Sequence, residues 1–300
     1  MVALTAGVRR NVTVDPSVAC HAREMSRPIF EVDVFETGPF SGNPVAVVLD
    51  ADGLSTEEMQ RFAHWTNFSE TTFVLAPADP DADYLLRIFT PTVELPFAGH
   101  PTLGSAHAWI EAGGQAKGEA PVQECGVGLV ALRSACGGHF SFEAPPLRRS
   151  GPVEADVFAD ACRQLQLDPA SVLRAEWVDN GPEWIALELG SLEELLAVSA
   201  VPGERDVAVF ARLPQGDEAA IEVRAFFPQD GNTVEDPVTG SLNASVAQWL
   251  LGDGSLTAPY RSRQGTVLGR RGLVEVEQDP TGAIWVGGAT TTRVRGTVGL

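Results

Sequence analysis

Two segments of this sequence carry the same residue types in the same order, and both contain groups that ionise or bind ligands. The segment from Arg87 to His100 reads Arg-x-Phe-x-Pro, two further residues, and then Glu-x-Pro-x-x-Gly-His. The segment from Arg224 to Ser241 repeats this pattern with a spacer of six residues and ends in Ser. One copy lies in each half of the chain, so we predict two related domains.

Each repeated segment ends where a helix is predicted to begin, at Gly99 and at Gly240. A glycine there lets the backbone approach a ligand closely. The free N–H groups and the positive dipole end of a helix N-terminus favour an anion. Two such helix ends facing one cleft would hold a carboxylate or a developing enolate without a metal ion. The helix predicted after Ser241 has no charged residue, which is typical of a helix enclosed by a strand barrel.

The composition argues against several other classes of protein. The 300 residues include 21 basic and 40 acidic side chains, and the net charge of −19 disfavours binding to nucleic acids or anionic membranes. Lys117 is the only lysine, so an enzyme that forms a Schiff base is not expected. The four cysteines and five histidines show no metal-binding spacing, and the sequence has no nucleotide-binding glycine motif. We therefore expect no cofactor, no metal and a cytoplasmic location.

Hydrophobic patterns predict an α/β (α+β) fold in which strands outnumber helices and each half has both. Capping boxes at Ser55 with Glu58 and at Ser191 with Glu194 mark two helix starts. The other predicted helices span residues 103–110, 157–165 and 242–251. The predicted strands span residues 30–34, 45–49, 72–75, 84–89, 128–132, 139–142, 184–189, 220–227, 272–277 and 283–286, with a last extended stretch around Val294 and Val298.

Shifts in composition divide the chain into parts. Residues 1–27 show no hydrophobic period and are expected to be a disordered extension, or to result from a start placed too early, with Met25 near the true start. The Pro- and Gly-containing stretch 145–152 is the best candidate for a domain boundary. We predict an N-terminal domain over 28–146 and a C-terminal domain over 147–288, with the last strand, about 289–300, returning to the first domain.

Five motifs together resemble those of the PhzF (phenazine biosynthesis protein) family, and the resemblance extends from about Phe30 to the end of the chain. The resemblance implies a diaminopimelate-epimerase-like fold of two pseudo-symmetric domains. Each domain would be a strand barrel around a central helix, with the active site in the cleft between the domains. The motifs are Ser41 to Val47 (SGNPVAV), Asn67 to Phe73 (NFSETTF), Arg87 to Pro91 (RIFTP), Glu94 to Thr102 (ELPFAGHPT) and Glu235 to Ser241 (EDPVTGS).

The same resemblance implies cofactor-free proton transfer on a small carboxylate-bearing substrate, of the type of trans-2,3-dihydro-3-hydroxyanthranilate isomerase. Glu70, in the Ser-Glu-Thr-Thr motif, would be the general acid and base. His100 and Asp236 would assist proton movement or orient the substrate. The residues implied to hydrogen-bond the substrate are Ser69, Gly99, Gly240 and Ser241. The resemblance leaves a homodimer open as the oligomeric state.

Two other functions remain open at this stage. One is an epimerase or racemase of a small carboxylic acid that uses Glu70 or His100 in place of thiols. Epimerase and racemase relatives carry catalytic cysteines near Ala98–Gly99 and Asp236–Pro237, and this chain has none there. The other is a non-catalytic protein that binds a small acid on the same fold. None of the four cysteines of this chain lies in the segments where those epimerases and racemases carry theirs; they are Cys20, Cys125, Cys136 and Cys162.

Each candidate catalytic residue also has a purely structural interpretation. Glu70 would then be an ordinary surface carboxylate beside a strand, and His100 a helix cap. Asp236 would cap the turn before Pro237. Ser241 is suited both to capping its helix and to donating a hydrogen bond to a ligand, since the two roles are compatible.

We expect the tail of residues 1–27 to be dispensable for stability, because it lacks a hydrophobic period and lies outside the family resemblance. A chain that starts at Met25 should keep the melting temperature of the full chain within error in differential scanning calorimetry. A large fall in melting temperature would show that the removed residues pack on the rest of the molecule.

Overall fold

The computed structural model describes residues 26–135 and 138–300, and the expected extension lies outside them except for its last two residues. Ser26 and Arg27 belong to the first strand, where Arg27 is buried and donates to the carbonyl oxygens of Asp50 and Asp52. The prediction that the extension reaches residue 27 is therefore wrong for Ser26 and Arg27. The first-half elements are β1 (Ser26–Val34), β2 (Asn43–Val48), α1 (Thr56–Thr66), β3 (Glu70–Leu75), β4 (Tyr84–Phe89), β5 (Glu94–Leu95), α2 (Gly99–Glu111), β6 (Val122–Cys125), β7 (Gly128–Ala135) and β8 (His139–Glu143).

The second half includes five strands longer than three residues that the hydrophobic pattern did not predict, β9, β10, β12, β14 and β15. At Ser191 only half of the predicted capping box forms, because the serine accepts from the Glu194 N–H without a return bond. The elements are β9 (Arg149–Pro152), α3 (Ala155–Gln164), β10 (Val172–Asp179), β11 (Ile185–Leu189), α4 (Leu192–Ala197), β12 (Val207–Arg212), β13 (Ile221–Gln229), β14 (Asn232–Asp236), α5 (Gly240–Gly252), β15 (Tyr260–Gln264), β16 (Gly272–Gln278) and β17 (Ile284–Gly299).

The two halves repeat one strand order. β2 pairs in parallel with β3, and β11 pairs in parallel with β12. β4 and β13 come next, and each pairs with a short antiparallel strand and with a second, parallel strand. Phe89 lies opposite Glu94, and Phe226 lies opposite Glu235, so the two repeated segments have the same register. The predicted internal repeat is therefore present as two copies of one topology.

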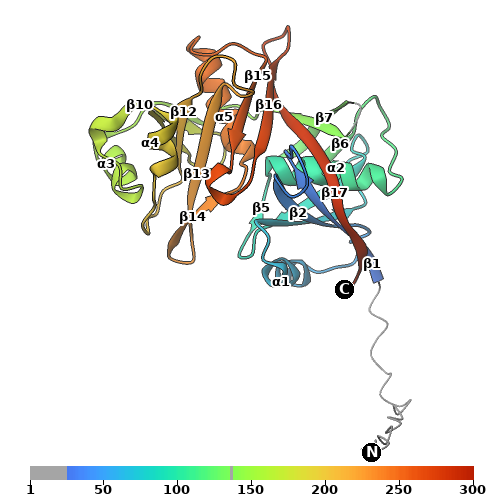
Figure 1. The fold of residues 1–300 in the computed structure, drawn as a ribbon. Helices are drawn as coiled ribbons and strands as arrows, with labels where there is room; N and C mark the ends of the chain where they lie inside the picture. The colour runs from blue at the N-terminus through green and yellow to red at the C-terminus, as the bar shows by residue number, and fades with distance from the viewer. Residues whose placement is uncertain (1–25, 136–137) are drawn as a thin grey trace, which may run out of the picture.

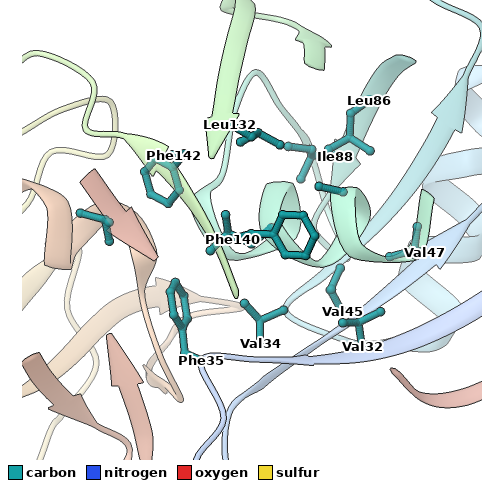
Figure 2. Packing of buried hydrophobic residues seen from close by; sticks show 14 of the residues in the cluster. Val32, Val34, Phe35, Val45, Val47, Leu86, Ile88, Leu132, Phe140 and Phe142 are labelled. Atoms are coloured by element: carbon teal, nitrogen blue, oxygen red, sulfur yellow. The ribbon is translucent and has the colours of Figure 1, made fainter. Parts of the chain in front are cut away.

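A helix lies inside the sheet of each half. α2 packs against β1, β2, β8 and β17, and α5 packs against β10, β16 and β17, as Figure 1 shows. α5 has no charged residue and most of its side chains are buried, as expected of an enclosed helix. Figure 2 shows the first-half core around α2, where each fully buried aliphatic or aromatic side chain contributes about 1.5–3 kcal/mol. Of the helices in the described residues, none is both long and apolar enough to cross a membrane.

Strands are exchanged between the two halves. The end of β17, from Thr290, pairs along the whole of β1, and its beginning pairs with β8 and β16. β9, which follows β8 in the chain, pairs with β10 of the second half. In Figure 1, β17 is the long red strand that runs from the second half to the C-terminus beside β1. The pairing of β17 with β1 is what the predicted return of residues 289–300 to the first domain requires. The division of the chain into two domains stays a prediction.

The arginine and glutamate of each repeated segment form a bidentate ion pair that joins the strands leading to the helix. Arg87 Nε and Nη2 donate to the two carboxylate oxygens of Glu94 at 2.7 and 2.6 Å. Arg224 binds Glu235 in the same way at 2.9 and 2.7 Å. The second pair is far more buried, with side chains 3% and 9% exposed against 23% and 36% for the first.

We predict that the two equivalent pairs differ in their contribution to stability. The Arg224→Met variant should lower the free energy of unfolding by about 3–5 kcal/mol, because it leaves the Glu235 carboxylate buried without its partner. The Arg87→Met variant should lower it by less than about 1 kcal/mol, because this pair is solvated. Urea unfolding of both variants measures the difference, and equal losses would contradict it.

Candidate active site

The three predicted catalytic side chains come together where the two halves meet. α1 ends at Asn67 in a left-handed conformation with φ 57°, and the chain then enters β3 at Glu70. His100 is the second residue of α2, and its Nε2 lies 3.3 Å from Glu70 Oε2. Asp236 ends β14, and its negative charge acts on Glu70. His100 is buried, and the Glu70 side chain is 16% exposed.

Asn43 links these residues and was not among the predicted site residues. Its amide nitrogen donates to Asp236 Oδ1 at 3.0 Å and to the Val238 carbonyl oxygen at 2.9 Å. The same nitrogen lies 3.4 Å from His100 Nδ1. Asn43 follows Gly42, where a Cβ atom would lie 2.1 Å from the Val34 carbonyl oxygen, so only glycine fits this approach.

Burial disfavours the charged forms of both Glu70 and His100. Desolvation raises the pKa of Glu70 well above its ordinary value, and the Asp236 charge raises it further. Desolvation lowers the pKa of His100 to about 3. Glu70 Oε2 and His100 Nε2 are both buried without a hydrogen bond to the described residues. Burial therefore disfavours the charged form of each group and opposes an ion pair between them.

Asp236 is held on both carboxylate oxygens. Oδ1 accepts from Asn43, and Oδ2 accepts from Thr239 Oγ1 at 2.6 Å. Gln264 in turn holds Thr239, because its amide accepts from the Thr239 N–H at 3.0 Å and donates to the hydroxyl at 2.9 Å. Burial raises the pKa of Asp236 to about 6, although the hydrogen bonds from Thr239 and Asn43 oppose the rise. Asp236 therefore ionises at a lower pH than burial alone would allow.

The N-termini of α2 and α5 meet at the same place. A Cβ atom on Gly240 would lie 3.3 Å from the Gly99 Cα and 3.2 Å from the His100 nitrogen. Within the described residues, neither N-cap side chain, Ala98 or Thr239, caps its helix. The first N–H groups of both helices are therefore free to bind an anion.

The two predicted serines lie beside these groups in the chain. Ser69 is partly buried and precedes Glu70. Ser241 is the second residue of α5, and its backbone carbonyl accepts from the Asn180 amide at 2.8 Å. Their hydroxyl groups have no hydrogen bond that would tie them to Glu70, His100 or Asp236 in the described residues, so their contact with a substrate stays a prediction.

Asp206 occupies the position in the second half that Glu70 occupies in the first. In each half, the residue that directly follows the acid pairs with the phenylalanine of the repeated segment. This phenylalanine is Phe89 for Glu70 and Phe226 for Asp206. Burial raises the pKa of Asp206 to about 6. The second segment ends in Ser241 where the first has a histidine, so the two positions differ in chemistry. A cavity of about 270 Å³ beside Asp206 is lined by Trp177, Gly181, Pro182, Glu183, Glu204 and Arg205.

The remaining reactive groups lie apart from this site. Cys125 and Cys162 are buried thiols whose pKa values are raised by burial, while Cys20 and Cys136 lie outside the described residues. Cys125 lines a cavity of about 460 Å³ that borders the Arg87–Glu94 pair. Within residues 26–135 and 138–300, no three Asp, Glu, His or Cys side chains are arranged to hold a metal ion. The expectation that no cofactor is needed stays a prediction.

Comparison with known proteins identifies the family. A family model described as phenazine biosynthesis-like protein, PhzC-PhzF, matches residues 32–297. The chain belongs to the PhzC-PhzF family. The trans-2,3-dihydro-3-hydroxyanthranilate isomerase of Pseudomonas chlororaphis is 34% identical, over 90% of this chain and 98% of that protein. A Schizosaccharomyces pombe protein named antisense-enhancing sequence 1 is 36% identical, over 89% of this chain and 96% of its own. The predicted resemblance is confirmed.

Solved structures place this PhzC-PhzF protein in the diaminopimelate-epimerase-like fold, as predicted. A phenazine biosynthesis protein of the PhzF family from Bacillus anthracis has a TM-score of 0.77 at 22% identity, covering 91% of this chain and 99% of that one. A hydroxyproline epimerase from Agrobacterium vitis, solved with trans-4-hydroxy-L-proline, has a TM-score of 0.57 at 13% identity, covering 92% and 93%. At these identities the likeness concerns the fold alone.

The lowered pKa predicts that His100 of this PhzC-PhzF protein stays neutral through the physiological range. With a pKa of about 3 against the ordinary 6.5, its imidazole should show no titration between pH 5 and 8. Because the unfolded chain binds this proton at higher pH, the group should make the folded state more stable as pH rises from about 3 to 6.5. Heteronuclear NMR with selectively labelled histidine measures the titration, using His100→Asn to assign the signal. A midpoint near 6.5 would contradict the burial argument.

Proposed function

We propose that this protein is a cofactor-free isomerase that moves a proton along a small carboxylate-bearing substrate, the type of reaction named for its Pseudomonas chlororaphis relative. The observation that carries the proposal is the buried carboxyl group of Glu70, 3.3 Å from a neutral imidazole. A carboxyl group with a raised pKa exchanges protons at neutral pH more effectively than an ordinary carboxylate. His100 and Asp236 assist it, and the helix N-termini bind the substrate.

In the proposed reaction Glu70 carries the proton between two carbons. The ionised form removes a proton from a carbon conjugated with the substrate carboxylate, and the electron pair moves into a dienolate. The protonated form then returns the proton to a different carbon of the conjugated system. The raised pKa makes the carboxylate a stronger base, which favours the first step. No atom is gained or lost, so the product is an isomer of the substrate.

The surrounding groups support this cycle in different ways. The free N–H groups at Gly99 and Gly240 bind the substrate carboxylate and stabilise the dienolate charge. The hydroxyls of Ser69 and Ser241 donate further hydrogen bonds to the substrate. Neutral His100 offers a partner for the Glu70 proton without adding a positive charge that would lower the pKa of Glu70. Ionised Asp236 raises that pKa.

Two rival functions remain on the same fold. A two-thiol epimerase is disfavoured because Cys125 and Cys162 are buried, with pKa values raised against the reactive thiolate. An epimerase in which Glu70 or His100 replaces a thiol would exchange the proton at one carbon and invert its configuration. A binding protein would hold the small acid without exchanging any carbon-bound proton. Proton-exchange measurements separate these outcomes.

The Glu70→Gln variant should bind a small acid but lose at least about 10²–10⁴-fold in rate, because glutamine keeps the shape and cannot carry the proton. The matched control is Asp206→Asn, which removes the equivalent acid of the second half and should keep wild-type activity. The assay is NMR in heavy water with trans-2,3-dihydro-3-hydroxyanthranilate and a panel of cyclic and acyclic carboxylic acids.

The pattern of deuterium incorporation decides between the functions. Deuterium at a new carbon with a shifted double bond supports the isomerase, and inversion at a single carbon supports the epimerase. Unchanged exchange by the Glu70→Gln variant would remove Glu70 as the base and leave His100 as the next candidate. Binding by the wild-type protein without any exchange would support the binding protein.

A further inference from the structure

Asn43 is a fully buried amide that connects the two halves at the candidate site. It lies at the first position of β2 in the first half, and two of its partners, Asp236 and Val238, lie in the segment leading to α5 of the second half. Its third neighbour, His100, belongs to the first half. One side-chain nitrogen therefore contacts both an acid and an imidazole of the proposed reaction.

The nitrogen and the oxygen of the Asn43 amide differ in their hydrogen bonding. The nitrogen has two N–H groups and donates to two acceptors, Asp236 Oδ1 and the Val238 carbonyl oxygen, so its donor capacity is fully used. The amide oxygen, Oδ1, is buried and has no hydrogen bond with any described residue. Leaving a buried acceptor unpaired costs about 1–3 kcal/mol, which is unfavourable for a residue whose only role is packing. The two donor bonds, to Asp236 and to the Val238 carbonyl oxygen, are therefore what Asn43 contributes at this position.

We propose that Asn43 is a positioning residue that holds Asp236 of the second half and His100 of the first half in a fixed relation to Glu70. The proposal rests on the proposed function, since it concerns the geometry of the same proton transfer. Asn43 does not contact the reacting atoms itself. It acts through Asp236, whose Oδ1 it binds while Thr239 binds the other oxygen.

Loss of the Asn43 N–H groups would change the pKa of Asp236 and, through its charge, the pKa of Glu70. The hydrogen bond from Asn43 favours the ionised form of Asp236 and so lowers its pKa. Without this bond, Asp236 keeps its proton to a higher pH. The Asp236 charge that raises the pKa of Glu70 then forms only at a higher pH, and below that pH Glu70 is a weaker base.

The test compares Asn43→Leu, which keeps the volume and removes both donors, with Gln123→Met as the matched control. Gln123 is also a fully buried first-half amide, and it bonds Tyr84 and Thr102 rather than the candidate catalytic residues. The first measurement is the titration of the Asp236 carboxyl carbon by NMR in the ligand-free protein. We expect its midpoint to rise above the wild-type value in Asn43→Leu and to stay at that value in Gln123→Met.

The second measurement is the pH dependence of kcat on trans-2,3-dihydro-3-hydroxyanthranilate. Asn43→Leu should lower kcat by about 10²-fold at neutral pH, as expected for a misplaced catalytic group, with a much smaller change in KM. The acid limb of the profile should move to higher pH. The Gln123→Met control should keep the wild-type profile, even if its melting temperature falls.

The outcomes separate this inference from the proposed function. An unchanged Asp236 midpoint in Asn43→Leu, with only a lower melting temperature, would reduce Asn43 to a packing role and overturn the inference. If the wild type turns over no substrate, the proposed function fails, while the Asp236 titration still tests the inference. Should Asn43→Leu not fold, Asn43→Ala provides the same titration without a donor, with a rise in the midpoint expected and no rise contradicting the inference.

Discussion

The contact between Gly99 and Gly240 is the constraint on which the rest of the structure depends. Two helix N-termini meet there, and a side chain at Gly99 would lie 2.6 Å from the Phe142 ring. Each end carries the positive part of its helix dipole, so the meeting is electrostatically unfavourable unless a negative charge is near. The Asp236 carboxylate, just before α5, supplies part of that charge. A bound substrate carboxylate would supply the rest, which relates the architecture directly to the class of ligand.

The strand exchange keeps this arrangement rigid. β17 pairs with β16 and β8 and then continues along β1, so a shift of one half against the other would break pairing along a strand of 16 residues. The bidentate Arg–Glu pairs add local stiffness directly before each helix. Glu70, His100 and Asp236 come from different elements in two halves, and their relation is maintained by this framework and by Asn43. Pre-organised groups of this kind need little rearrangement during a reaction.

Much of this arrangement was predictable from the residues, and the exceptions have physical reasons. The repeated segments located both helix starts because a glycine followed by a polar residue is a local signal. Glu70, His100 and Asp236 followed from the family motifs, and the structure brings them together. Asn43 stood in one of those motifs and was missed, because an amide has no reactivity of its own and its role depends on partners about 57 and 193 residues away. The equivalence of Asp206 with Glu70 is visible only in the strand register.

We infer that Glu70 and His100 form a neutral pair in which the mobile proton belongs to the carboxyl group. Neutron diffraction from a deuterated crystal at neutral pH observes this directly. We expect a deuteron on the Glu70 carboxyl group and a single deuteron on the His100 ring. A bare Glu70 carboxylate facing a doubly deuterated imidazolium would show an ordinary ion pair and would contradict the claim.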